Sequence, residues 1–215
     1  MKLFKKLIFQ VHTTGETLPK FNVAIFASGE GSNAQNLWRV ASKAGHPVRG
    51  LICDRQDAGV IKLAEQENIP HIVINKKDYL KKQSDFEAAI LNQLIEWDVN
   101  WIFLAGFMTI LSSHFLKMYF NSITQKFQVI NIHPSLLPQY PGTKSYQQAY
   151  ADKVNTHGVT VHYVDEGVDT GPIIEQQIFT RDIAWSFEEF VAFGKSIEHK
   201  LYEKVFLNFL NEHLE

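Results

Sequence analysis

The feature that most constrains this chain is an alternation of short apolar runs with stretches whose apolar residues recur at helical spacing. Neighbouring parallel strands need a crossover between them, usually a helix, so this order predicts βαβ units. We therefore expect an α/β fold: a doubly wound, mostly parallel sheet with helices on both faces. The predicted strands span residues 21–27, 48–53, 71–74 and 101–104, and the predicted helices span residues 33–44, 59–68 and 86–97.

After residue 128 the pattern changes. Residues 158–164 and 172–179 have the composition of consecutive strands with no helical stretch between them, which predicts a C-terminal β-hairpin. A long helix is then predicted to open at the capping box Ser186-Phe-Glu-Glu189 and to end near Phe209. With 215 residues, 45% of them hydrophobic, the chain can bury one sizeable core. We interpret residues 1–20 as an N-terminal extension and residues 21–215 as a single domain.

The composition argues against several classes of protein. A formal net charge of −2 provides no basic footprint for a nucleic-acid backbone. No apolar run approaches the roughly eighteen residues of a membrane-spanning helix, so we expect no membrane partner. The single cysteine, Cys53, cannot form an internal disulfide, which fits a reducing cytoplasm. Because Cys53 closes an apolar run, we expect a buried, inert thiol.

A glycine-rich turn, Ser28-Gly-Glu-Gly-Ser-Asn33, lies between the first predicted strand and the first predicted helix. Glycines let the backbone approach an anion, and the N–H groups at the start of the helix then point at it. The segment Gly29-x-Gly31-x-x-Ala34 also satisfies a relaxed dinucleotide fingerprint, with Asp54 where a ribose-binding acid would stand. The alternative is an ordinary turn whose helix is capped by Ser32 or Asn33. Position and composition favour an anion site.

A second segment, Leu104-Ala-Gly-Phe-Met-Thr-Ile-Leu111, is an apolar loop directly after a predicted strand. Open α/β sheets bind ligands at the carboxyl ends of their strands. A flat heteroaromatic ring can lie against such a loop and pair with its backbone groups. The alternative interpretation of this segment is ordinary core.

Proton-handling side chains stand at the ends of two further segments that otherwise have the composition of buried strands. Asn131 and His133 alternate by two, so both side chains leave the same face of one strand. Asparagine can donate an N–H to a developing oxyanion, and histidine can exchange a proton near neutral pH. His162 and Asp169 follow, and Asp169 is suited to orient the imidazole or to accept a proton through water. These residues predict an enzyme; the alternatives are structural histidines, or a metal site of His133, His162 and Asp169, whose spacing matches no compact ligand motif.

Taken together, these segments resemble the phosphoribosylglycinamide formyltransferase family, in order and spacing from about Asn22 to Tyr202. The resemblance implies a Rossmann-like formyltransferase fold and a single catalytic domain over residues 21–215. It also implies transfer of a formyl group from 10-formyltetrahydrofolate to the amine of 5-phosphoribosylglycinamide in purine biosynthesis. The matching text is Ser28-Gly-Glu-Gly-Ser-Asn33, Leu104-Ala-Gly-Phe-Met108 with Ile110-Leu111, Asn131-Ile-His-Pro-Ser-Leu-Leu-Pro138, Tyr140-Pro-Gly142, His157-Gly158 and Asp169-Thr-Gly-Pro172.

The resemblance also implies a role for each matching position. The catalytic set would be Asn131, His133 and Asp169. The glycinamide substrate would be held by Gly31, Ser32 and Asn33 at its phosphate and by Glu198 at its ribose, with His162 in support. The folate would be held by Asn131, Asp169 and the residues Gln83, Met108, Thr109, Ile110, Leu111, Asp165, Glu166, Gly167 and Val168. No metal is required, the partners are small molecules, and the protein would act as a monomer or homodimer.

The chain departs from the family pattern on the folate side. Thr109 and Gln83 fall at or near positions where the family often has arginine, and Lys76, Lys77, Lys81 and Lys82 either replace those cations or form a solvated basic face. The run Thr143-Lys-Ser-Tyr-Gln-Gln-Ala149 leans toward the formyltetrahydrofolate hydrolases, whereas Pro134 argues against them. A hydrolase and, more distantly, a dinucleotide-binding Rossmann protein therefore remain alternatives. Sugar-amine and methionyl-tRNA formyltransferases share the catalytic set but usually add a C-terminal domain.

Overall fold

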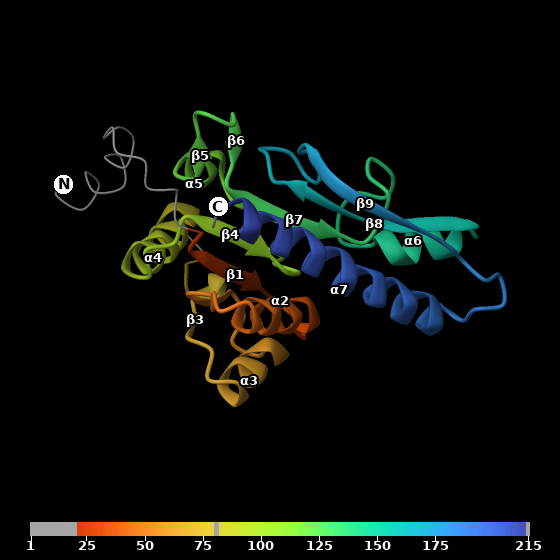
Figure 1. Ribbon diagram of the computed structural model, residues 1–215, viewed down its shortest axis with the longest axis horizontal. Helices are drawn as coiled ribbons and strands as arrows, with labels where there is room; N and C mark the ends of the chain where they lie inside the picture. Colours follow the sequence, from red (N-terminus) through yellow and green to blue (C-terminus); the bar gives the residue numbers. More distant parts are fainter. Residues whose placement is uncertain (1–20, 80–81, 214–215) are drawn as a thin grey trace.

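The computed structural model describes residues 21–79 and 82–213. Figure 1 shows an open sheet with helices packed on both sides and the long helix α7 lying across one face. The strands are β1 Val23–Ala27, β2 Gly50–Cys53, β3 His71–Val73, β4 Trp101–Leu104, β5 Phe120–Asn121, β6 Lys126–Phe127, β7 Val129–His133, β8 Thr156–Tyr163 and β9 Ile173–Thr180. The helices are α2 Ser32–Lys43, α3 Gly59–Gln66, the 3₁₀ helix η1 Lys76–Tyr79, α4 Gln83–Glu96, α5 Ser113–Lys117, α6 Ser145–Ala151 and α7 Phe187–Glu212.

The main sheet has the strand order β3-β2-β1-β4-β7-β8-β9. The pairs from β3 to β7 are parallel, whereas β8 and β9 join antiparallel to the β7 edge. The chain winds outward from β1 to β3 and then returns to place β4 on the other side of β1. That reversal makes the carboxyl ends of β1 and β4 a topological switch point, where open α/β sheets bind ligands. The predicted doubly wound, mostly parallel sheet and the C-terminal hairpin are confirmed.

The core lies on both faces of the sheet because the central strands are apolar on both sides. In β1, Val23, Ile25 and Ala27 pack toward α2, α3 and α7, whereas Ala24 and Phe26 pack toward α4 and α5. Full burial of β1, β2 and β4 explains why these segments are continuous apolar runs rather than alternating ones.

The predicted strands and helices agree with the observed bounds to within one helical turn, and the capping box at Ser186 and Glu189 is present. Several elements were not predicted: α5, α6 and the small β5–β6 hairpin. The helices α5 and α6 are too short to establish an apolar period in the sequence. The proposed extension, residues 1–20, lies outside the described residues, and the division into an extension and one domain stays a prediction.

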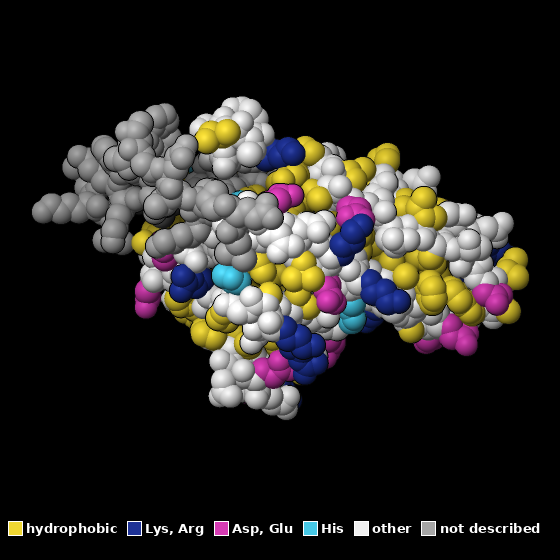
Figure 2. All heavy atoms as spheres, viewed as in Figure 1, with side chains coloured by type: hydrophobic (Ala, Val, Ile, Leu, Met, Phe, Trp, Pro, Cys, Tyr) yellow, Lys and Arg dark blue, Asp and Glu magenta, His cyan; other side chains and the backbone are white. Residues whose placement is uncertain are grey.

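The surface charge follows the near-neutral composition. Figure 2 shows Lys, Arg, Asp and Glu side chains interspersed over the face that carries α7, without a broad field of one sign. Among the described residues, no helix is both long and apolar enough to cross a bilayer.

Candidate active site

The end of β7 carries the proposed catalytic pair. Asn131 and His133 leave the same side of the strand, and His133 is buried at its last position. The antiparallel neighbour β8 places His162 directly opposite Asn131 in the register. The parallel neighbour β4 pairs Leu104 with Asn131, so the apolar loop that follows Leu104 begins at the same edge of the sheet.

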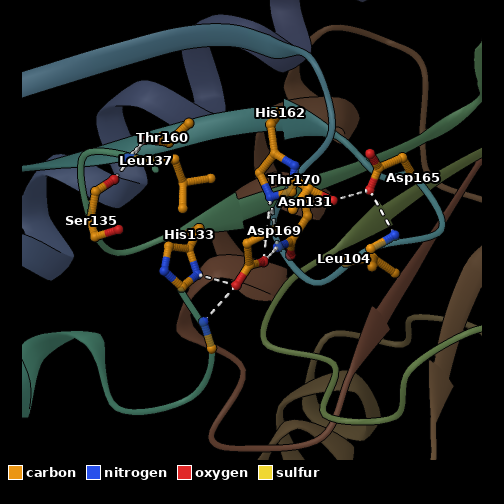
Figure 3. A network of polar contacts seen from close by, with 12 residues as sticks. Leu104, Asn131, His133, Ser135, Leu137, Thr160, His162, Asp165, Asp169 and Thr170 are labelled. Atoms are coloured by element: carbon orange, nitrogen blue, oxygen red, sulfur yellow. Dashed lines mark hydrogen bonds and ion pairs between the residues drawn. The ribbon is translucent and has the colours of Figure 1, made fainter. Parts of the chain in front are cut away.

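Asp169 joins these groups from the loop between β8 and β9. Its backbone is left-handed, with φ of 55°, and this conformation turns the carboxylate toward the end of β7. One oxygen accepts a hydrogen bond from the Gly142 backbone N–H at 2.7 Å and lies 3.3 Å from His133 Nδ1. The other lies 3.4 Å from Asn131 Nδ2 and 3.6 Å from His162 Nε2 (Figure 3). The structure thus brings Asn131, His133, His162 and Asp169 together, and their catalytic role stays a prediction.

Asp169 is held in its ionised form. Burial opposes ionisation, but hydrogen bonds from His162 and from the Gly142 N–H, together with the charges of His133 and His162, outweigh it and lower the pKa of Asp169. His133 Nε2 lies 2.8 Å from the Tyr140 carbonyl oxygen, which can only accept. Each ring nitrogen of His133 therefore faces an oxygen acceptor: Nδ1 faces the Asp169 carboxylate and Nε2 faces the Tyr140 carbonyl.

His162 has a supporting place in this arrangement. Its side chain is 2% exposed, and Nδ1 donates to the Tyr163 carbonyl oxygen at 2.8 Å. Nε2 lies 3.2 Å from Asn131 Nδ2 and 3.6 Å from Asp169 Oδ1, so the ring touches both of these groups. The geometry shows His162 orienting Asn131, and its direct contact with a substrate stays a prediction.

The glycine-rich turn between β1 and α2 builds the candidate anion site. Gly31 is the N-cap of α2 with φ of 84°, and a Cβ there would lie 2.4 Å from Val60 Cγ2, so only glycine fits. The alternative, in which Ser32 or Asn33 caps this helix, does not hold, because no side chain caps it. The Asn33 carboxamide instead donates to Glu198 Oε2 on α7 at 2.6 Å. The structure therefore brings the turn and Glu198 together, and their binding of a substrate stays a prediction.

Exposed apolar side chains mark the candidate folate site. Met108, Ile110 and Val168 are 57%, 64% and 50% exposed, an arrangement that leaves apolar surface open beside the catalytic cluster. Leu111 is buried and anchors its segment in the core. Open apolar side chains with main-chain groups between them suit a flat ring that also needs hydrogen bonds.

The side chain of Thr109 does not face the predicted folate site, contrary to expectation. It is buried, and its hydroxyl donates to Asp54 Oδ2 at 2.6 Å, so the side chain turns into the protein rather than toward a ligand. In the dinucleotide-binding alternative, the Asp54 carboxylate would bind a ribose. Here it already accepts the hydrogen bond from Thr109. Asp54 is itself buried at the end of β2, and this weakens that alternative.

Three further contacts hold the ends of the segment Met108–Leu111. At its start, the Met108 N–H donates to Ser28 Oγ at 2.8 Å. At its end, Gln83 Nε2 donates to the Ile110 carbonyl oxygen at 3.0 Å, and the buried Glu87 carboxylate accepts from the Ser112 N–H at 2.7 Å. Gln83 thus reaches the predicted folate segment through its backbone.

The loop Asp165–Asp169 is shaped by its own side chains. Asp165 Oδ1 accepts from the Gly167 N–H at 3.0 Å and from the Thr170 hydroxyl at 2.7 Å (Figure 3). Glu166 lies 3.8 Å from Lys117 Nζ, both side chains being exposed. These contacts give the loop a defined shape next to the catalytic carboxylate.

Two other kinds of reactive group are the Cys53 thiol and the acidic, histidine and cysteine side chains that could bind a metal. Cys53 is buried, and burial raises the pKa of its thiol, as expected for an inert side chain. Among the described residues, no group of three or more His, Cys, Asp or Glu side chains has the arrangement of a metal site.

Comparison with known proteins gives the family. A family model described as formyl transferase matches residues 21–206. The chain belongs to the formyl transferase family. Phosphoribosylglycinamide formyltransferase of Bacillus subtilis (strain 168) is 40% identical over 184 residues, which are 85% of this chain and 91% of that protein. The trifunctional purine biosynthetic protein adenosine-3 of Chironomus tentans is 39% identical over 180 residues, 80% of this chain but 13% of that protein.

Solved structures agree. The crystal structure of phosphoribosylglycinamide formyltransferase from Streptococcus pneumoniae TIGR4 has a TM-score of 0.80 and 32% sequence identity, and the match covers 89% of this chain and 99% of that one. The formyltransferase fold that the sequence resemblance implied is therefore confirmed.

Several residues of this formyl transferase contact the candidate site but were not predicted to do so. Tyr146 on α6 donates to Glu198 Oε1 at 2.6 Å, and Glu87 and Asp54 hold the apolar segment. Asp54 and Glu87 lie within or directly after buried segments, and an acidic residue in such a place is a signal for a partner. Tyr146 gave no such signal, because a tyrosine on a short helix is ordinary.

Proposed function

We propose that the protein transfers a formyl group from 10-formyltetrahydrofolate to the amine of 5-phosphoribosylglycinamide, a step of purine biosynthesis. The observation that carries this proposal is that Asn131, His133 and Asp169 meet at the end of β7, on the same edge of the sheet as the turn at Gly31 after β1 and the apolar segment at Met108 after β4. A phosphorylated substrate and a flat cofactor would meet over the groups that handle the proton.

The site fits the folate co-substrate that the family uses. Exposed Met108, Ile110 and Val168 provide apolar contact for a ring, and the loop Asp165–Asp169 provides main-chain partners on the other side. Bound there, the folate supplies the formyl carbon and departs as tetrahydrofolate.

The residues of the chain would divide the chemistry as follows. The neutral amine of the glycinamide adds to the formyl carbon, and its oxygen gains negative charge. In this proposal protonated His133 and the Asn131 carboxamide each exchange one protein partner for that oxygen and donate to it; one such donor typically lowers a barrier by roughly 3–4 kcal/mol. Asp169, ionised by the contacts described above, takes the proton that the attacking nitrogen must lose, directly or through water. The proton needed by the departing folate nitrogen comes from His133 or that water.

The glycinamide would be fixed away from the reacting atoms. We assign its phosphate to the N–H groups at Gly31, Ser32 and Asn33, where the start of α2 favours an anion. We assign its ribose hydroxyls to Glu198, whose carboxylate lies next to this turn through Asn33. Hydroxyl groups donate, and a carboxylate only accepts.

The decisive experiment separates transfer from hydrolysis. Release of tetrahydrofolate from 10-formyltetrahydrofolate is followed with and without phosphoribosylglycinamide, and the N-formyl product and formate are quantified. We expect release to depend on the glycinamide and to match the N-formyl product in amount. Equal release of formate without the glycinamide would establish the hydrolase instead.

Two further statements belong to this proposal. The partners are small molecules, with no metal and no nucleic acid, and the protein acts as a monomer or homodimer. We place it in the cytoplasm, because its single cysteine fits a reducing compartment.

A further inference from the structure

The ribose end of the site contains a carboxylate that is compensated by neutral donors. Glu198 is buried, and among the described residues no Lys, Arg or His forms an ion pair with it. Its oxygens are instead held one each: Oε2 by Asn33 Nδ2 and Oε1 by the Tyr146 hydroxyl, both at 2.6 Å. A buried carboxylate needs such partners, and two donors on different oxygens also fix the plane of the group.

Tyr146 is itself built into place. Its ring packs edge-on against Phe190 at 5.7 Å and near His157 at 5.6 Å. Opposite the hydroxyl stands Gly194, one turn before Glu198 on α7, where an added Cβ would lie 2.3 Å from the hydroxyl oxygen. The absence of a side chain at that position lets the phenol reach the carboxylate.

The open groups that remain are acceptors. A carboxylate has about four acceptor positions, of which the two protein donors use two. Asn33 Oδ1 is also buried and has no partner among the described residues. A ligand that satisfies this set must bring donors, as the vicinal hydroxyls of a ribose do.

We propose that Tyr146 is the positioning residue of the ribose site: its hydroxyl orients Glu198 so that the carboxylate receives both ribose hydroxyls. This inference rests on the proposed function, because it takes phosphoribosylglycinamide as the ligand. Within the described part of the chain, the hydrogen bond of Tyr146 goes to Glu198 and its ring contacts go to His157 and Phe190, none of them in the catalytic cluster. Its contribution therefore falls on binding of this substrate and not on formyl transfer or on the folate.

The variant Tyr146→Phe removes the hydroxyl and keeps the ring. We expect the KM for phosphoribosylglycinamide to rise about tenfold, as for a lost bond to a charged group. The kcat and the folate KM should stay within about twofold of the wild-type values, well below the tenfold change expected for the glycinamide KM. The matched control is Tyr150→Phe, on the same helix, whose hydroxyl donates to the Trp185 carbonyl oxygen and does not touch Glu198. Gly194→Ala, which displaces the hydroxyl without changing it, should raise the same KM.

A substrate analogue tests the link to the ribose. The 2′,3′-dideoxyribose form of phosphoribosylglycinamide is measured as a competitive inhibitor of wild type and Tyr146→Phe. We expect its inhibition constants in the two proteins to agree within about twofold, because the hydroxyls that Glu198 would bind are gone. An unchanged glycinamide KM in Tyr146→Phe, or a tenfold loss that persists with the dideoxy analogue, would overturn the assignment. Failure of the proposed function is distinct: wild type would then show no glycinamide-dependent transfer at all.

Discussion

Replacing Asp169 with asparagine tests the catalytic cluster most directly. Asparagine is among the residues that tolerate left-handed backbone, so the φ of 55° at this position is retained. The carboxylate accepts on both sides, from the Gly142 N–H on one oxygen and from Asn131 on the other. A carboxamide has an acceptor on one side only, so in either orientation its NH₂ group faces a donor.

The size of the effect follows from these contacts. A hydrogen bond to a charged group contributes about 1.5–3 kcal/mol, and we expect Asp169→Asn to lose stability of that order at pH 7. The loss for turnover is larger, because the variant loses both the proton acceptor and the charge that faces His133. General acid–base catalysis typically contributes 10²–10⁴-fold, or roughly 3–5 kcal/mol of barrier, and we expect kcat to fall by that factor.

The pH dependence of stability has a definite sign. The folded-state pKa of Asp169 is lowered, so its stabilisation is present above the unfolded value of about 4 and is lost as pH falls through the lowered pKa. The difference in unfolding free energy between wild type and Asp169→Asn should therefore be constant near neutrality and shrink below about pH 4. Denaturant titration at a series of pH values measures it.

The assay is steady-state formyl transfer with both substrates varied, and the control is Asp182→Asn. Asp182 is an exposed acid in the turn before α7 that accepts from the Ala184 N–H, so its replacement should leave kcat within about threefold. A folded Asp169→Asn protein that keeps kcat within fivefold of wild type would remove Asp169 from proton transfer.

Three other substitutions test the binding of each substrate and the contribution of one buried histidine to stability. Gly31→Ala forces a Cβ against Val60 and should both destabilise the fold by about 1–3 kcal/mol and raise the glycinamide KM, measured by denaturation and kinetics; an unchanged KM would refute the anion site. Glu87→Gln replaces the charged acceptor of the Ser112 N–H and hydroxyl with a neutral amide and should raise the folate KM about tenfold and leave the glycinamide KM unchanged; the reverse pattern would contradict the folate assignment. Burial lowers the pKa of His157, so its contribution to stability is present above about pH 6.5 and declines as pH falls toward the lowered value; His157→Gln should flatten that part of the stability–pH curve, and an unchanged slope would exclude His157 as its source.

The fold could be predicted because its signals are local. Continuous apolar runs such as Val23–Ala27 mark strands covered on both faces, and the capping box at Ser186 marks where α7 opens. The short helices α5 and α6 escaped prediction for the opposite reason. Their sequences span too few turns to show a period, and their positions depend on packing, as when Tyr146 of α6 contacts α7.

Some parts of the candidate site could likewise be predicted from the sequence, and others could not. Asn131 and His133 could be placed together from strand alternation, and Asp169 from the resemblance. The partners of Thr109 and Glu198 could not, because Asp54 and Tyr146 are 55 and 52 residues away from them in the chain. A hydrogen bond across that distance depends on the tertiary fold and leaves no pattern in the sequence.

The absence of the expected arginines on the folate side has a structural counterpart. The segment that follows β4 is held by carboxylates behind it: Asp54 accepts from Thr109, and Glu87 accepts from the backbone of Ser112. Both acids are buried, and neither has a cation among the ion pairs of the described residues, so each depends on the donors that the segment provides. Removing a donor leaves a buried charge unsatisfied, which makes the shape of the segment costly to change. In this chain the apolar surface of Met108 and Ile110 is therefore fixed from within the protein before any folate arrives.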